Sequence, residues 1–367
     1  MLICLVEFMK VSIGSRIIDG PWGGGNLFVV NLKNYLQNNG HKVIHDLCDK
    51  DIDVVLLTDP RSRKESSSTF NHEDIKRYKK LVNPNVVVIQ RVNECDERKG
   101  TNYINKYYLD ASDCADHVIF VSNWLKNIYT NIGMAETKTS VIMSGADEDI
   151  FNTSGLAEFN RKKIKFVTHH WSDHSNKGFD IYKKFDEMLS LSENSNLEFT
   201  YIGNVPKDVN FKNIIVKPPI SGLTLAKEIK KNNIYLTASK NEPSGNHHIE
   251  AAQCGLPILY FNSGGIPEYC NGFGIEFEDD FSERLFEIIE NYEKYKEKLK
   301  DYPFSSESMC KEFFETFNII MQRNQKSKVK INVLMRDLFL LKNRFHKTLT
   351  GINVKQYLKY KLKRFKK

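Results

Sequence analysis

Short runs rich in β-branched residues alternate with amphipathic stretches along most of the chain. In the first unit, a predicted strand at residues 10–14 leads through a glycine-rich loop at 20–26 into a predicted helix that ends near Gly40. Strand, loop and helix in this order are typical of a parallel sheet covered by its own crossover helices. The sequence therefore predicts an α/β protein.

The alternation falls into two series. Strands of the first series are predicted at residues 10–14, 41–44, 53–57, 86–90, 117–121 and 139–143. Strands of the second are predicted at 164–168, 197–202, 213–216, 233–237 and 257–261. The intervening helices are predicted at 70–81, 124–132, 180–191, 223–231, 246–254 and 281–298. Since 367 residues suffice for two cores, we expect two Rossmann-like domains with a central cleft.

The expected domain limits follow from these two series. An N-terminal Rossmann-like domain is expected at residues 9–155 and a C-terminal Rossmann-like domain at 160–302. A helix at 303–322 is expected to pack back on the body, and a basic amphipathic tail follows at 323–367.

Composition excludes several classes of protein. The hydrophobic share of 41% and the charged share of 27% are those of a soluble globular protein. No apolar run reaches the roughly 18 residues of a membrane-spanning helix, and Glu7 and Lys10 interrupt the apolar opening, which makes it a poor signal peptide. The seven cysteines are scattered and form no C-x-x-C pair. We therefore expect neither a disulfide framework nor a structural zinc, and a cytoplasmic location.

The positive charge is concentrated in the tail. Residues 323–367 hold fifteen Lys or Arg and one acid, so this segment carries +14 and the other 322 residues carry −7 of the net +7. A body of this charge is not expected to bind nucleic acid. Apolar residues interleave with the tail's lysines, at 338–341, 345, 357, 358 and 362. Three interpretations remain open: a segment lying on an anionic membrane, a solvated tail, or a helix packed on the body.

Two glutamates eight positions apart, Glu242 and Glu250, lie in the most informative segment, residues 241–269. Glu242 follows a predicted strand, and Glu250 lies about one turn inside the next predicted helix. Open α/β sheets bind ligands at the carboxyl ends of their strands. Carboxylates at that edge are suited to accept hydrogen bonds from sugar and ribose hydroxyls.

Two features rich in free backbone amides flank these glutamates. The predicted helix N-terminus at Gly245, Asn246 and His247 has unpaired N–H groups and a positive dipole end. The turn at Gly264 and Gly265 brings bare backbone close to an anion because glycine lacks Cβ. We expect a diphosphate to lie between them.

Lys177 is the expected cation of the site. It lies in a loop that follows the first strand of the second series, directly before Gly178 and a predicted helix. A lysine there would stabilise the charge that grows on a leaving diphosphate. His169, His170, His174 and Asp173 occur in the same loop, but their spacing matches no common metal site, so no metal is expected.

Several motifs occur in a fixed order. They are Gly23-Gly24-Gly25-Asn26, Gly40-His41-x-Val43, Ser144-Gly145-Ala146-Asp147-x-x-x-Phe151, Asn176-Lys177-Gly178, and Glu242-x7-Glu250 with Ala251-Ala252, Gly255-x-Pro257 and Gly264-Gly265-Ile266-Pro267-Glu268. Together they resemble the group 1 (family 4) glycosyltransferases of the GT-B fold, over nearly the whole length to about residue 322. The Glu/Gly/Pro segment is the most specific of them.

The resemblance implies retaining transfer of a sugar from a nucleotide-diphospho-sugar, with no metal and no cofactor besides the donor substrate. It implies that Lys177 binds the diphosphate, Glu242 the hydroxyls of the transferred sugar and Glu250 the donor ribose. Glu242 and Lys177 are thus the expected catalytic residues. Gly24 and Gly25 are expected to approach the donor as well.

The chain departs from the family pattern at two places. Ser172 stands where the family usually has an arginine, five residues before the lysine. His169, His170 or Asn176 would then supply the hydrogen-bond donor that this arginine provides. Residues 245–248 replace the family's hydrophobic G-x-P between the glutamates. We place Ser172, His170 and residues 245–247 on the donor side.

The charged string at residues 91–100 follows the predicted strand at 86–90, so it begins at the edge that faces the cleft. Arg91, Asn93 and Asp96 are the acceptor-side candidates, and Asn93 or Asp96 would orient the attacking hydroxyl. The alternative is an ordinary charged surface loop.

The sequence therefore predicts a hexosyltransferase that acts on a glycan, a lipid-linked compound or another hydroxyl acceptor. Two alternatives remain. A nucleotide-sugar epimerase of the same fold would use the same donor groups without an acceptor, and a catalytically silent, carbohydrate-binding relative would account for the missing arginine.

Overall fold

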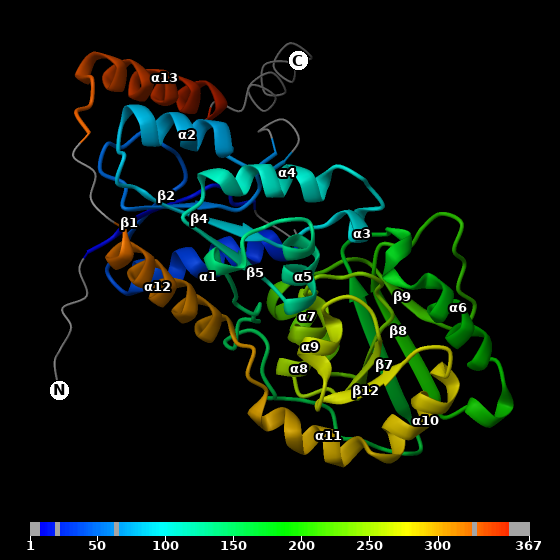
Figure 1. Cartoon of the computed structure of the whole chain (residues 1–367). Coiled ribbons are helices and arrows are strands. Elements are labelled where there is room, and N and C mark those ends of the chain that lie inside the picture. The colour runs from blue at the N-terminus through cyan, green and yellow to red at the C-terminus, as the bar shows by residue number, and fades with distance from the viewer. Residues whose placement is uncertain (1–7, 19–22, 62–65, 325–328, 352–367) are drawn as a thin grey trace, which may run out of the picture.

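The computed structural model describes residues 8–18, 23–61, 66–324 and 329–351, and side chains up to residue 345 (Figure 1). Within these residues the chain forms two six-stranded sheets in which all paired strands are parallel. Helices cover both faces of each sheet (Figure 1). The predicted α/β class with two Rossmann-like sheets is confirmed.

The first sheet has the strand order β2-β1-β3-β4-β5-β6. Its strands are β1 (Lys10–Ile13), β2 (Lys42–Ile44), β3 (Val54–Leu57), β4 (Val87–Val92), β5 (His117–Phe120) and β6 (Thr139–Val141). Successive side chains of a strand point to opposite faces. Accordingly Val54 and Leu56 of β3 belong to one core, and Val55 and Leu57 to the other. Because both faces are covered, the strand is apolar throughout.

The helices of the first domain are α1 (Gly24–Asn38), α2 (His72–Leu81), the single turn α3 (Asp96–Lys99), α4 (Ile104–Ala111) and α5 (Asn123–Asn131). One face of the sheet is covered by α1 together with α12 (Ser306–Arg323), which returns from the second domain. Phe313 of α12 lies against Phe28 of α1, with ring centroids 5.0 Å apart. Helices α2, α4 and α5 cover the other face.

The second sheet has the order β12-β11-β10-β7-β8-β9. Its strands are β7 (Ile164–His170), β8 (Leu197–Gly203), β9 (Ile215–Lys217), β10 (Ile234–Thr237), β11 (Ile258–Phe261) and β12 (Gly274–Phe277). Helices α7 (Gly222–Ile229), α8 (Asn246–Gln253) and α9 (Ile266–Cys270) pack on one face, and α6 (Phe179–Met188) and α10 (Phe281–Glu290) on the other. Helix α11 (Tyr292–Lys298) and then α12 follow.

The structure differs from the predicted elements where tertiary contacts extend or divide them. Strand β4 continues through Arg91 because β5 pairs with it there, so Arg91 lies in the sheet and not in a loop. Strand β7 includes His169 and His170, which pair with β8. Gly24 and Gly25 form the first turn of α1 and not a loop. The single helix predicted at 281–298 is two helices, α10 and α11.

No helix among the described residues is both long and apolar enough to cross a membrane.

Candidate active site

Lys177 and Glu242 form a buried ion pair in the loops that follow β7 and β10. The lysine Nζ donates to Oε2 of Glu242 at 2.6 Å, and the two residues are 9% and 7% exposed. Burial alone would raise the pKa of the Glu242 carboxyl, but the charges of Arg98 and Lys177 outweigh it and hold that pKa well below its usual range. The carboxylate is therefore ionised at neutral pH.

Arg98 of α3 brings the first domain into this ion pair. Its Nε donates to Oε1 of Glu242 at 3.0 Å, and its Nη1 donates to both carboxylate oxygens of Glu94 at 3.0 Å. The Asn176 side chain, next to Lys177, donates to the carbonyl oxygen of Arg98 at 2.9 Å. Glu242 is thus held between one cation from each domain, an arrangement that keeps a buried carboxylate charged.

Arg98 had no distinguishing mark in the sequence, where it was one of six charged residues in the string at 91–100. Its partner Glu242 lies 144 residues further along the chain. The sequence shows only that several charged residues follow a predicted strand of the first sheet. This pattern does not distinguish Arg98 from the charged residues next to it.

Glu250 lies one turn inside α8 and is 5% exposed. Its Oε2 is 2.8 Å from Nε2 of His169, at the end of β7, and Nδ1 of the same ring is 3.1 Å from the Tyr235 hydroxyl. His169 thus links the two strands β7 and β10 to the carboxylate on α8. The expected ribose-binding residue is thus held in place by a histidine.

Three more buried histidines, His170, His247 and His248, pack beside His169. The His170 ring lies 4.8 Å from that of His247, and the His247 ring lies 4.9 Å from that of His248. Burial lowers the pKa of His170 and His247 well below 6.5 and that of His248 to about 3. These three rings are therefore uncharged at neutral pH.

The donor-side candidates have different partners. His170 Nε2 is 2.7 Å from the Tyr182 hydroxyl and His247 Nε2 is 2.8 Å from Oγ1 of Thr237, so both rings are engaged within the second domain. Ser172 Oγ accepts a hydrogen bond from the His174 N–H at 3.2 Å. The structure thus brings His170 and His247 beside the ion pair, whereas Ser172 stabilises a turn in the preceding loop.

The start of α1 meets the start of α8 across the two domains. A Cβ on Gly24 would lie 2.5 Å from the Asn246 Oδ1, so a side chain at Gly24 would require the Asn246 side chain to move. Gly25 follows, and its nearest outside neighbour is the Asn93 amide. Two helix N-termini, each a positive dipole end, therefore converge near Glu242 and Lys177.

The acceptor-side candidates Arg91, Asn93 and Asp96 have different surroundings. The Arg91 guanidinium is buried and lies 4.0 Å from the Phe28 ring centroid, and burial lowers its pKa to about 10. Asp96 has another role: its carboxylate accepts from the N–H groups of Tyr103, Ile104 and Asn105, so it caps the start of α4. Asn93 and Arg91 thus lie near α1, while Asp96 is occupied by the local backbone.

The turn at Gly264 and Gly265 lies directly against the Glu242 loop. The Gly265 N–H donates to the Glu242 carbonyl at 2.9 Å. A Cβ on Gly265 would lie 2.2 Å from the Pro243 carbonyl oxygen and 2.7 Å from Oγ of Ser122 in the first domain. The turn therefore positions Glu242 through close backbone contact.

Replacement of Gly265 by alanine is expected to lower the free energy of unfolding by about 1–3 kcal/mol, because the added methyl group overlaps this backbone. Urea denaturation followed by circular dichroism measures the change. Gly25→Ala is the matched control, since Gly25 is helical and has only the Asn93 amide, at 3.9 Å, near its Cβ position. Equal midpoints for the two variants would contradict this close packing.

Comparison with known proteins places this geometry in a family. Residues 182–302 match the family model described as glycosyl transferases group 1, a segment that contains Glu242, Glu250, Gly264 and Gly265. This segment is a group 1 glycosyltransferase domain. The resemblance seen in the sequence motifs is thereby confirmed.

Curated relatives of the group 1 domain include the phosphatidylinositol N-acetylglucosaminyltransferase GPI3 subunit of Saccharomyces cerevisiae. The protein of strain RM11-1a is 28% identical over an alignment of 224 residues, which covers 55% of this chain and 48% of the relative. The subunit of strain YJM789 is 27% identical over the same length. The chain therefore spans about half the length of the curated relatives it matches.

Solved glycosyltransferases share the whole fold. A glycosyltransferase from Rickettsia africae superposes with a TM-score of 0.64 at 16% identity, over 86% of this chain and 99% of that one. The catalytic domain of starch synthase IV from Arabidopsis thaliana, bound to ADP and acarbose, gives 0.65 at 12% identity, over 86% and 100%. The group 1 domain and its N-terminal partner together form the GT-B fold.

Proposed function

We propose that the protein is a retaining glycosyltransferase that moves a sugar from a nucleotide-diphospho-sugar to a hydroxyl of a carbohydrate or lipid-linked acceptor. The observation that carries the proposal is the buried Lys177–Glu242 pair, which lies beside Glu250 where the two domains meet. A desolvated lysine next to two helix N-termini is suited to an anionic leaving group.

In the proposed donor complex, Lys177 contacts the diphosphate, Glu242 the hydroxyls of the transferred sugar and Glu250 the ribose. The start of α8 at residues 245–247 and the turn at Gly264 and Gly265 lie next to the diphosphate. ADP in starch synthase IV and UDP in the HepE protein of Anabaena, both solved with the same fold, support a nucleotide-linked donor.

The reaction breaks the bond between the anomeric carbon and the diphosphate oxygen. The acceptor oxygen bonds to the same face of that carbon, and its proton passes to the leaving phosphate oxygen, so no protein base is needed. Asn93, near Gly25 at the start of α1, is proposed to contact the acceptor from the first domain, whereas Arg91 is buried against Phe28.

A nucleotide-sugar screen tests the proposal. We expect one of the UDP-, GDP- or ADP-sugars to raise the melting temperature and to release its nucleotide slowly in the absence of an acceptor. Glu250→Gln replaces the charged carboxylate by a neutral amide with a single acceptor oxygen. It is expected to weaken donor binding by about tenfold, because hydrogen bonds to charged groups contribute about 1.5–3 kcal/mol.

Three outcomes separate the alternatives. Nucleotide release that depends on Glu250 supports transfer. An altered sugar that remains attached to its nucleotide indicates an epimerase, and binding without any turnover indicates a silent relative. Glu276→Gln, an exposed glutamate of β12, is the control and is expected to leave the binding of the donor unchanged.

We also propose a cytoplasmic location. The six cysteines within the described residues are all free and buried, which fits a reducing compartment.

A further inference from the structure

Helix α13 (Val333–Gly351) is attached to the first domain by one face. Leu340 is buried in the core below α2, and the ring of Phe339 lies 6.3 Å from that of Tyr78 in α2. In Figure 1 the two helices lie next to each other at the edge of the first domain. Of the three interpretations of the tail, packing on the body therefore applies to this part.

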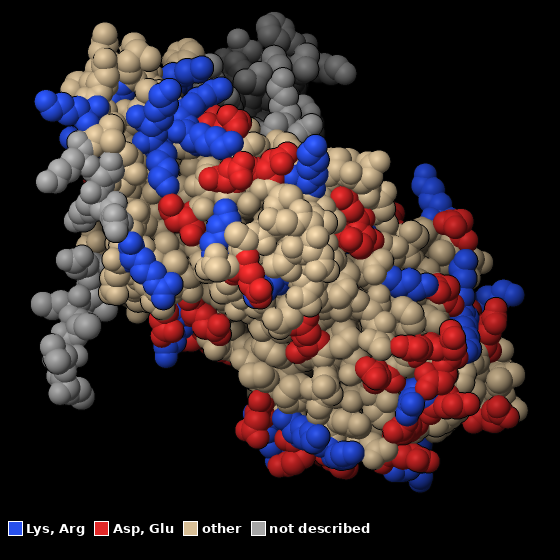
Figure 2. Space-filling model, in the orientation of Figure 1, with Lys and Arg blue, Asp and Glu red and all other residues tan. Residues whose placement is uncertain are grey.

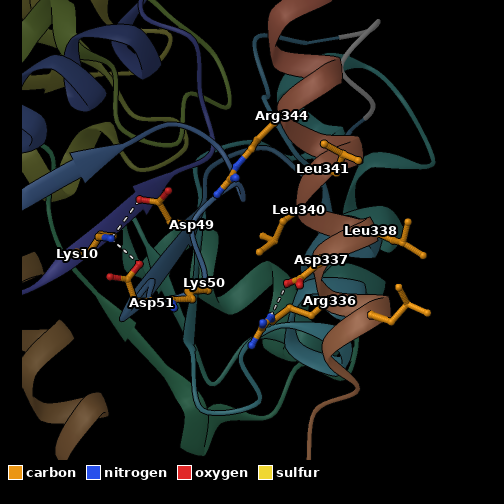
Figure 3. Close-up of a pocket in the computed structure, with 11 residues that line it drawn as sticks. Lys10, Asp49, Lys50, Asp51, Arg336, Asp337, Leu338, Leu340, Leu341 and Arg344 are labelled. Carbon is orange, nitrogen blue, oxygen red and sulfur yellow. Dashed lines mark hydrogen bonds and ion pairs between the residues drawn. The ribbon is translucent and has the colours of Figure 1, made fainter.

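The opposite face of α13 is also apolar. Residues 334, 338, 341 and 345 recur at intervals of four, three and four, so they lie within about 60° of one another around the helix axis. Leu340 lies roughly opposite this stripe. Figure 3 shows Leu338 and Leu341 pointing away from Lys10 and Asp49, toward which Leu340 points. The exposed fractions of the stripe are high: Leu334 68%, Leu338 52%, Leu341 64% and Phe345 66%.

Such a stripe is unusual for a helix already anchored by its other side. Four large apolar side chains in one exposed row mark a surface that meets another apolar phase. The inner face, with Leu340 and Phe339, already supplies the attachment to α2. The outer stripe is therefore available for a second contact.

The charge around the stripe indicates what that contact is. Lys342 is exposed on α13, and Arg77 and Lys80 are exposed on the neighbouring α2. Arg344 is also exposed, and its guanidinium donates to the Cys48 carbonyl at 3.3 Å. In Figure 2 blue side chains gather over this part of the first domain, whereas red ones gather over the second domain around α6 and α10. The segment from residue 323 onward carries +14 against −7 for the rest of the chain.

We propose that the outer face of α13 docks on an anionic lipid membrane, with the stripe at the boundary between headgroups and acyl chains. Apolar residues backed by lysines and arginines are the pattern of helices that lie in this boundary. A second copy of α13 fits less well, because the same positive charges would face each other. This surface adds to the proposed transfer reaction a means of reaching a lipid-linked acceptor.

Vesicle flotation of the full chain tests the proposal. The chain is expected to float with vesicles that contain phosphatidylglycerol, much less with pure phosphatidylcholine, and less at high salt. The double variant Leu338→Ser/Leu341→Ser is expected to bind on the order of a hundredfold more weakly, since two leucines no longer leave water. Leu223→Ser is the matched control, an exposed leucine of α7 in the second domain, and is expected to bind like the unaltered chain.

Equal flotation of the double variant and the unaltered chain would overturn the proposal. A concentration-dependent dimer that the double variant loses, without vesicle binding by either protein, would show a second copy as the occupant instead. Flotation is measured without a sugar donor, and nucleotide release without vesicles, so docking and transfer can fail separately. The double variant is expected to remain folded, because its changes leave the inner face of α13 intact. Far-UV circular dichroism checks this.

Discussion

Replacement of Lys177 by alanine is expected to lower turnover of the sugar donor by about tenfold to a hundredfold. A hydrogen bond to a charged group contributes about 1.5–3 kcal/mol, and the negative charge on the diphosphate grows as the glycosidic bond breaks. The loss should therefore appear mainly in kcat, measured as nucleotide released from a saturating donor. Arg98 still holds Glu242 in this variant, so the carboxylate keeps a partner.

Two further variants separate the charge of Lys177 from a structural role. Lys177→Arg keeps the charge and is expected to retain part of the activity. Lys240→Ala removes a lysine from the Glu242 loop whose partner Asp180 is exposed, and it is expected to behave like the unaltered protein. If Lys177→Ala turned over the donor at the normal rate, Lys177 would have no part in departure of the diphosphate.

Acidification is expected to lower the free energy of unfolding by roughly 4 kcal/mol between about pH 7.5 and pH 5.5, which is a large share of typical stabilities. His170, His247 and His248 are buried and uncharged, and burial lowers their pKa values in the folded state. In the unfolded chain each takes up a proton below its ordinary pKa of about 6.5. The unfolded state thus binds more protons than the folded state. The free energy of unfolding therefore decreases as the pH is lowered, by about 1.4 kcal/mol per histidine over this range.

The lowered pKa of Glu242 changes the free energy of unfolding in a different, more acidic pH range. Its contribution is present above the ordinary carboxyl value of about 4.5 and is lost only as the pH falls below it. The window between pH 7.5 and 5.5 therefore reports on the histidines.

His248 offers the sharpest test of this pH dependence, since neither ring nitrogen has a hydrogen-bond partner among the described residues. His248→Leu is expected to remove about 1.4 kcal/mol of the pH-dependent loss, measured by urea denaturation at the two pH values. Ile249→Val, at the adjacent buried position of α8, is the control and should shift stability equally at both. An unchanged pH dependence in His248→Leu would mean that this ring takes up its proton at the same pH in the folded protein as in the unfolded chain.

The class of the fold and the order of its parts follow from local pattern. Strands such as β3 are runs of Val and Leu that remain apolar whichever face they point to, since helices cover both faces of a parallel sheet. Glu242, Glu250 and Lys177 were placed by the same logic, because loops after parallel strands open at one edge.

Tertiary pairing decided where those elements end. Whether β4 stops before Arg91 or continues through it depends on its neighbour β5, whose own sequence lies some thirty residues further on. The same holds for His169 and His170, which pair with β8. A run of residues does not itself contain this information.

Contacts within the site were decided by tertiary structure alone. Arg98 reaches Glu242 across 144 residues, and His169 meets Glu250 across 81. Asp96 turns to the start of α4, although the sequence predicted it to be an acceptor-side residue. The sequence by itself determined which side chains stand at the carboxyl ends of the strands, because alternation and glycine spacing are local properties. Which of those side chains pair, and which face of α13 remains uncovered, depends on how two separately formed sheets and their returning helices pack together.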